Sequence, residues 1–229
     1  MNHAVHLAKH SSCPSSAWLD AIAPRLFTGE PGIQYHFFNV GANKGFAIAS
    51  MLQRFGLLQG NASTWHVALE GELRKTHPRL ASGTPCKSAA TCPKTCGVCG
   101  ACREPPPQIM APSAGSIKVH AFEMLHPNAQ WLEIASRRFA PLNTVRVSHA
   151  VVSDHDGEAC VPSGLAVGVE AAQAIVRPRA SAEHKCRQRT WQRVPKIMLD
   201  TYMAHHGIER VQVCSGRAHA GGKTLRPRE

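Results

Sequence analysis

A glycine-containing turn at residues 38–46, FNVGANKGF, has the residue types that could hold a cofactor. It lies between a run that favours a strand and a run that favours a helix, so backbone N–H groups and the positive end of the helix would meet there. Gly41 and Gly45 lack side chains where a ligand would approach the backbone. Their G-x-x-x-G spacing differs from the G-x-G-x-x-G of dinucleotide sites, which disfavours a nicotinamide cofactor. The simpler alternative is a bend between two core elements.

Glu123 is the second residue that could do chemistry, because a carboxylate at a strand end can accept hydrogen bonds from both hydroxyls of a ribose. It ends the run IKVHAFE, in which apolar and polar residues alternate. Nucleotide-binding units place this acid about 20 residues after the turn. Glu123 lies about 80 residues after Gly41, or about 40 once a predicted insertion is removed. Its position alone therefore favours an exposed strand-end acid.

Five of the nine cysteines lie in the run CKSAATCPKTCGVCGAC, residues 86–102. The steps from Cys96 to Cys99 and from Cys99 to Cys102 have the C-x-x-C spacing that lets two thiolates reach one zinc ion. Tetrahedral zinc takes four ligands, which Cys92, Cys96, Cys99 and Cys102 could supply. The run also resembles the end of small disulfide-stapled ShK-type modules. A cysteine-rich loop without metal is the third alternative.

Asp154, His155 and Asp156, in the run SDHDG, are candidate bases near a predicted strand end. A run of this composition between apolar segments is typical of a solvated turn. His205 and His206 stand near a predicted helix end, which favours capping or surface positions over metal binding. We therefore assign no catalytic base.

The composition fits one sizeable globular domain, because 229 residues with 43% hydrophobic side chains can build a core. The net charge of +11 would attract acidic or phosphate-rich partners. The basic residues are dispersed, however, with few aromatic residues among them, and this disfavours a nucleic-acid binder. No run approaches the roughly 18 apolar residues of a membrane span. The N-terminus lacks the apolar stretch of a secretory signal, so neither feature is predicted.

The elements that would position these residues alternate between strand and helix. Strand-like runs occur at residues 33–40, 117–123, 144–152 and 208–213, and helix-like runs at 45–56, 126–139 and, after a short strand or loop, 194–207. This alternation predicts an α/β fold with a parallel sheet flanked by helices. Residues 76–115, rich in Pro, Gly, Ser and Cys, are interpreted as a cysteine-rich insertion into a single domain spanning 1–229.

Four segments, in this order, resemble the FkbM-type family of S-adenosylmethionine-dependent methyltransferases: NVGANKG, VHAFEMLHPN, AVVSDHDG and VPKIMLDTYMAHHGI. The resemblance covers residues 37–213, apart from the insertion and an arginine-rich stretch. It implies a Rossmann-like class I methyltransferase sheet. It also implies methyl transfer from S-adenosylmethionine to an oxygen of a small-molecule or glycan-like acceptor.

The resemblance assigns residues to the methyl donor. The matched positions are Asn39, Gly41, Ala42, Asn43, Gly45, Glu123, Ala150 and Val151. The turn from Gly41 to Gly45 would lie under the donor, Glu123 would hold its ribose, and the last two residues would border its adenine. Asn39 stands where the family usually has an acid, which removes one favourable interaction with the positively charged methionine end.

The C-terminal part departs from the family pattern. The family continues into a Lys-x-Asp-x-Glu-Gly segment and further strands, whereas residues 214–229 read CSGRAHAGGKTLRPRE. We therefore expect a sheet that is incomplete at its C-terminal edge, followed by a disordered tail. One alternative is a catalytically inactive methyltransferase-like protein that acts as a cysteine-rich, zinc-binding interaction module. Another is a basic, zinc-dependent nucleic-acid binder.

Overall fold

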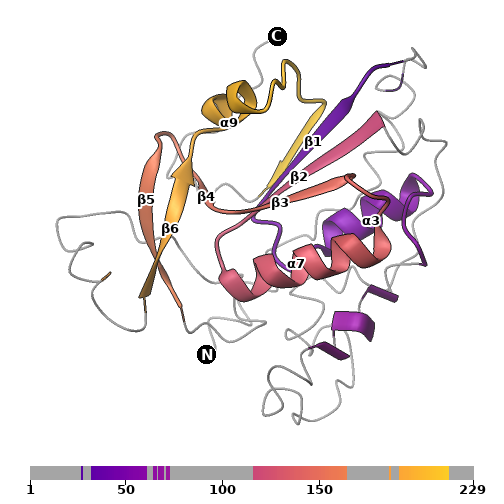
Figure 1. Ribbon diagram of the computed structural model, residues 1–229, viewed down its shortest axis with the longest axis horizontal. Coiled ribbons are helices and arrows are strands. Elements are labelled where there is room, and N and C mark those ends of the chain that lie inside the picture. Colours follow the sequence, from indigo (N-terminus) through magenta and orange to yellow (C-terminus); the bar gives the residue numbers. More distant parts are fainter. Residues whose placement is uncertain are drawn as a thin grey trace, which may run out of the picture.

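The chain folds into an α/β arrangement (Figure 1). The structure is a computed structural model, and it describes residues 27, 32–60, 64–65, 67–69, 71–72, 116–163, 186 and 191–216. The elements are β1 (Tyr35–Val40), α3 (Phe46–Arg54), β2 (Ile117–Glu123), α7 (His126–Phe139), β3 (Val145–His149), β4 (Val151–Val152), β5 (Gly157–Pro162), β6 (Trp191–Ile197), α9 (Leu199–His205) and β7 (Val213–Gly216). The predicted insertion at 76–115 lies outside the described residues.

The main sheet has four strands in the order β3-β2-β1-β7, and all of its pairings are parallel. This confirms the predicted parallel sheet. A second sheet has the order β4-β6-β5, with β4 parallel and β5 antiparallel to β6. Because parallel strands point the same way, the ends of β1, β2 and β3 lie along one edge of the main sheet.

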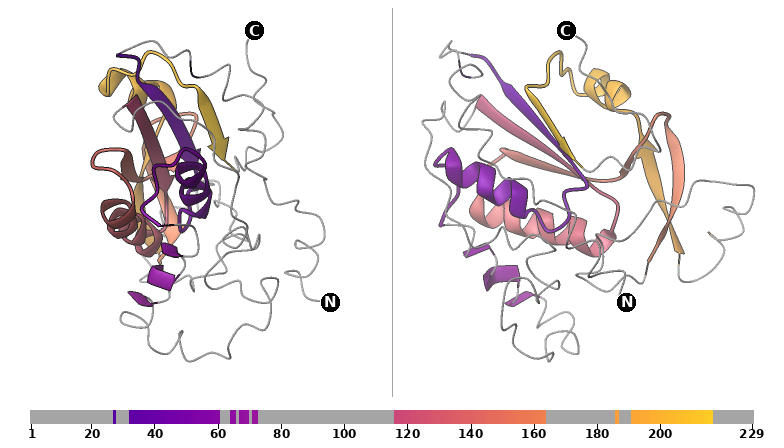
Figure 2. Two further views of the ribbon diagram at one scale, coloured as in Figure 1. Left: turned by 90° about the vertical axis from the view of Figure 1, so that its right-hand side faces the viewer. Right: turned by 180° about the vertical axis from the view of Figure 1, so that it is seen from behind.

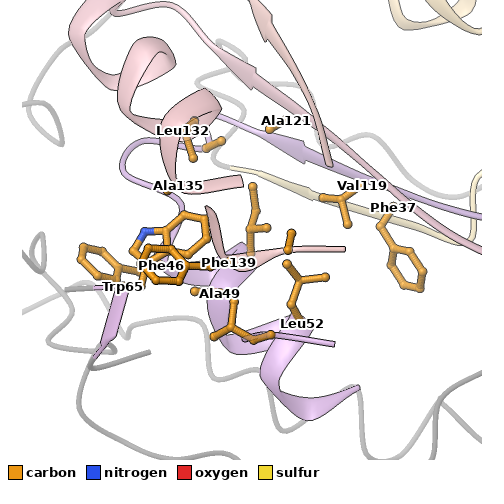
Figure 3. Close-up of a cluster of buried hydrophobic side chains, with 14 of the residues drawn as sticks. Phe37, Phe46, Ala49, Leu52, Trp65, Val119, Ala121, Leu132, Ala135 and Phe139 are labelled. Carbon is orange, nitrogen blue, oxygen red and sulfur yellow. The ribbon is translucent and has the colours of Figure 1, made fainter. Parts of the chain in front are cut away.

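The two faces of the main sheet carry different elements. Tyr35 and Phe37 alternate along β1 with Phe38, so they face opposite sides of the sheet. Tyr35 and Phe37 belong to the core under α3 and α7, whereas Phe38 packs with Tyr202 of α9. Figure 2 shows α3 and α7 lying along the same side of the sheet. The larger core therefore forms on that side, where Figure 3 shows Leu132 and other apolar side chains from the helices meeting those of the strands.

The strand predicted at residues 144–152 is in fact two strands. β3 ends at His149, and Val151 begins β4, which leaves the main sheet to pair with β6. Between them, the N–H of Ala150 donates to the carbonyl oxygen of Glu123 at 3.1 Å. The break was not predicted because the whole run is rich in β-prone residues.

The C-terminal strand also differs from its prediction. The prediction of a strand at residues 208–213 was wrong, because β7 begins at Val213 and continues through Gly216. The first three residues of the segment 214–229, expected to form a disordered tail, thus pair with β1. Residues 217–229 lie outside the described residues. Strand β5, which pairs antiparallel with β6, was not predicted. Within the described ranges, the helices are too short or too polar to span a bilayer.

Candidate functional site

The turn after β1 is fastened to the end of β2. Gly41, Asn43 and Gly45 have φ angles of 70°, 53° and 79°, in the left-handed region that favours glycine and asparagine. The N–H groups of Gly41 and Ala42 both donate to the carbonyl oxygen of Phe122, at 2.9 and 3.0 Å. The turn therefore lies directly beside Glu123, the next residue of β2.

Glu123 is buried, with 4% of its surface exposed, so the expectation of an exposed strand-end acid was wrong. Its Oε2 accepts a hydrogen bond from the Asn43 N–H at 2.7 Å, and its Oε1 accepts one from the Leu125 N–H at 2.8 Å. These bonds orient the carboxylate toward the turn. A carboxylate offers several acceptor positions, so one group can bond to more than one donor at a time.

Lys44 is the most buried polar residue of the turn, with 1% of its surface exposed. Its carbonyl oxygen accepts hydrogen bonds from two indoles, Nε1 of Trp65 at 2.8 Å and Nε1 of Trp131 at 3.1 Å. Its Nζ donates to Oδ1 of Asn43 at 3.1 Å. This clamp on the Lys44 carbonyl was not predicted from the sequence. The available signal was the presence of two tryptophans in apolar runs, since a buried indole N–H needs an acceptor.

The two glycines of the turn have different surroundings. A Cβ atom on Gly45 would overlap Leu132 and lie 2.8 Å from the ring of Trp65, so only glycine fits between α7 and the start of α3. A Cβ atom on Gly41 would meet no described atom within 4 Å. The turn is thus packed against protein at Gly45 and open at Gly41, and a ligand would approach at the open end.

Three other predicted donor residues lie along the same region. Asn39 is half-buried on β1, in register with Ala121 of β2. Ala150 is buried and bonded to Glu123 through its N–H, as described above. Val151 is buried in an apolar cluster of the second sheet with Val161 and Val194. Ala150 is therefore beside the acid and the turn, whereas the side chain of Val151 is part of a separate core.

His149 borders Glu123 and was not among the residues predicted from the sequence. His149 is in register with Glu123 on the neighbouring strand, and its Nε2–H donates to the carbonyl oxygen of Met124 at 3.0 Å. Burial lowers the pKa of His149, which keeps the ring neutral. The ring of His126, the first residue of α7, lies 5.2 Å from that of His149.

The SDHDG turn is exposed and supports α9. Oδ1 of Asp156 accepts the N–H of Met198 at 2.7 Å, and Oδ2 accepts the hydroxyl of Thr201 at 2.8 Å. These bonds lower the pKa of Asp156. Asp154 lies 2.6 Å from Nδ1 of His155, and this contact lowers its pKa. The turn thus caps a helix, and none of its three ionisable residues is assigned as a base.

The cysteines of the described residues do not form a metal site. The proposed zinc ligands Cys92, Cys96, Cys99 and Cys102 lie outside the described residues. Cys160 of β5 forms a disulfide with Cys186, with their Cα atoms 5.5 Å apart. In the part of the chain that the structure describes, no group of three or more His, Cys, Asp or Glu side chains is arranged to bind a metal.

Comparison with known proteins adds no family to this picture. No family model, no curated protein and no solved structure matches the chain. The turn, Glu123 and the sheet that brings them together are therefore the features from which a function can be inferred.

Proposed function

We propose that the chain is an S-adenosylmethionine-dependent methyltransferase domain of the FkbM type, which methylates an oxygen of a small-molecule or glycan-like acceptor. The observation that carries the proposal is the 2.7 Å hydrogen bond from the Asn43 N–H to Oε2 of Glu123. It joins two residues that are 80 positions apart in the sequence. The long spacing was the main argument against pairing the turn with this acid.

The sheet topology supports a ligand site at this place. Ligands of open parallel sheets bind outside the carboxyl ends of the strands, where the strand order reverses. Here the chain continues from β1 to β2 on one side, while β7 pairs on the other side. The turn from Gly41 to Gly45 follows β1 directly and therefore lies at this reversal.

The residues at the turn fit the polar groups of the donor. A carboxylate can accept hydrogen bonds from both hydroxyls of a ribose, which makes Glu123 a suitable residue for this role. The open approach at Gly41 leaves room for the donor to lie on the backbone, and Ala150 is positioned beside Glu123 to border the base. When bound, the donor would supply an electrophilic methyl group. The existing hydrogen bonds of Glu123 hold the acid and the turn in one orientation before the donor arrives.

A second candidate is a domain that binds the donor but transfers no methyl group. It is favoured by the bonding of Asp156, a candidate base in the SDHDG turn. Both of its carboxylate oxygens bond to α9, which indicates a structural role. Both candidates predict donor binding. Only the first predicts formation of S-adenosylhomocysteine when a broad panel of hydroxylated acceptors is supplied.

Calorimetry with S-adenosylhomocysteine tests the shared part of the proposal. Glu123→Gln should weaken binding at least about tenfold, since hydrogen bonds to a charged group contribute roughly 1.5–3 kcal/mol. Gly41→Arg should abolish binding by filling the open approach. The matched control is Glu133→Gln, which removes an exposed acid of α7 that pairs with Arg137 at 3.7 Å and should leave binding unchanged. Absence of heat with the folded wild-type chain would refute the proposal.

A further inference from the structure

A chain of hydrogen bonds crosses the sheet face that is covered by α9. Nδ1 of His36 on β1 lies 3.0 Å from Nε2 of His120 on β2. Nδ1 of His120 lies 2.9 Å from the hydroxyl of Tyr202 on α9. These contacts connect two central strands to a helix through one imidazole ring, and the proposed donor site does not use them.

His120 is deeply buried within this chain. Only 6% of its surface is exposed, and its ring lies 5.0 Å from that of Phe38 and 5.6 Å from that of Tyr202. Tyr202 is in turn the only buried residue of the seven-residue helix α9. Tyr202 therefore anchors α9 beside His120, and the partly buried Leu199 and Met203 pack against the same cluster.

The charges that face His120 oppose its protonation from every element packed against it. They come from His36 on β1, Lys118 on β2, Arg146 on β3 and His206 on α9, and no carboxylate of the described residues is among them. Nη1 of Arg146 lies 2.8 Å from Nδ1 of His206, at the solvent side of the cluster. Tyr202 contributes only a neutral hydroxyl. Burial first, and these neighbours second, lower the pKa of His120 from 6.5 to about 3.

The same chain reaches β7. The N–H of His36 donates to Oε1 of Gln212, and the N–H of Gln212 donates back to the carbonyl oxygen of His36 at 3.0 Å. Gln212 directly precedes β7. His36 therefore links the histidine pair to the strand that follows α9 in the sequence.

We propose that the hydrogen-bonded chain of His36, His120 and Tyr202 is an acid-sensitive latch, which holds α9 on the sheet at neutral pH and releases it in mild acid. A proton on His120 would be a buried charge without a counter-ion. Lifting α9 exposes the ring to water without breaking the ladder between β1 and β2.

Hydrogen exchange at about pH 7.5 and about pH 5 tests the latch, with protection factors corrected for the intrinsic pH dependence of exchange. The amides to follow are those of Tyr202, His206 and Ile208, which donate to carbonyls within residues 198–203. Opening of this segment should become roughly 5- to 30-fold more favourable over that interval. The upper figure is the full factor for uptake of one proton at the ordinary histidine pKa of about 6.5, and screening by solvent reduces it. Protection of α3 should change much less.

Three variants separate the latch from a general loss of stability. His120→Gln keeps the hydrogen-bonding groups without a titrating ring and should remove most of the acid effect on α9. His205→Gln is the matched control, since it removes an exposed histidine of the same helix and should keep the full effect. If His120→Gln does not fold, His36→Gln provides the second comparison and should reduce the effect. Equal loss of protection in α3 and α9 would overturn the proposal. So would an undiminished acid effect on α9 in His120→Gln or, if that variant does not fold, in His36→Gln.

Discussion

The two faces of the parallel sheet are stabilised in different ways. Under α3 and α7 the contacts are apolar, and residues such as Leu132 are completely buried. Under α9 the aromatic rings of Phe38 and Phe122 surround a buried histidine and a tyrosine hydroxyl. Packing of apolar groups is insensitive to protons, whereas burial of a neutral imidazole is not. One side of the same sheet is therefore expected to respond to acid and the other to changes in shape.

The largest effect is expected on the helix-covered side, at Gly45. Gly45→Ala should lower the free energy of unfolding by about 4 kcal/mol. Part of this cost comes from placing a side chain on a left-handed backbone, and the rest from its overlap with Leu132 and Trp65. Gly41→Ala has the same backbone problem and no overlap, so about 1 kcal/mol is expected. Urea unfolding of both variants measures the difference. Equal losses would show that the packing around Gly45 gives way freely.

Next in size is a cavity in the same core. Leu132→Ala should cost about 3 kcal/mol, because the residue is fully buried and the space it leaves cannot collapse completely. Ile134→Ala on the same helix is the control: Ile134 is 46% exposed, so a loss below about 1 kcal/mol is expected. Similar losses in the two variants would contradict the assignment of this helix face to the core.

A smaller effect is expected from acid, and it should originate at His120. Its pKa is lowered from 6.5 to about 3, so the unfolded chain binds a proton that the folded chain refuses. Stability is therefore complete above the unfolded pKa of 6.5 and falls as the pH decreases toward about 3. Between about pH 7 and about pH 5 we expect a loss of about 1 kcal/mol, reduced for screening by solvent near the cluster.

Denaturation curves at the two pH values measure this loss. Leu132→Ala should show the same pH-dependent difference as the wild type, since it alters the other face. His120→Gln should show a smaller one. If His120→Gln keeps the full pH-dependent difference in stability, the difference originates at another group.

An effect of similar size to that of acid is expected at Tyr202. Tyr202→Phe removes the hydroxyl that bonds to Nδ1 of His120 and should cost about 1 kcal/mol at neutral pH. The ring stays in place, so the contacts with Phe38 and Phe122 are retained. The change in unfolding midpoint of this variant, compared with His205→Gln, measures the hydrogen bonds of the hydroxyl, which include those with Ser148 and Arg146. No difference between the two would show that water replaces them.

Local patterns predicted the elements whose neighbours in sequence decide their structure. β2 and α7 have the predicted bounds, because alternation in IKVHAFE and helical spacing in HPNAQWLEIASRRF are complete within each segment. The turn and Glu123 were also found from the sequence. Their contact was not predicted by spacing, since about 80 residues separate them, and the cost of closing a loop grows only slowly with its length.

Long-range contacts account for what was missed. The strand at 144–152 breaks because β4 pairs with β6, a partner more than 40 positions away in the sequence. The bond between Asp156 and the start of α9 depends on the same pairing. The indoles of Trp65 and Trp131 meet at one carbonyl oxygen only after α7 packs on α3. The periodicity within a single segment does not predict these long-range contacts.

The clamp on the Lys44 carbonyl has an optical consequence. Trp65 and Trp131 are two of the four tryptophans of the chain, and both are buried at the turn proposed to hold the donor. Indole emission responds to the polarity and hydrogen bonding around the ring. The chain therefore carries its own fluorescent reporters within one hydrogen bond of the turn, and emission from an unlabelled sample can follow any ligand that moves it.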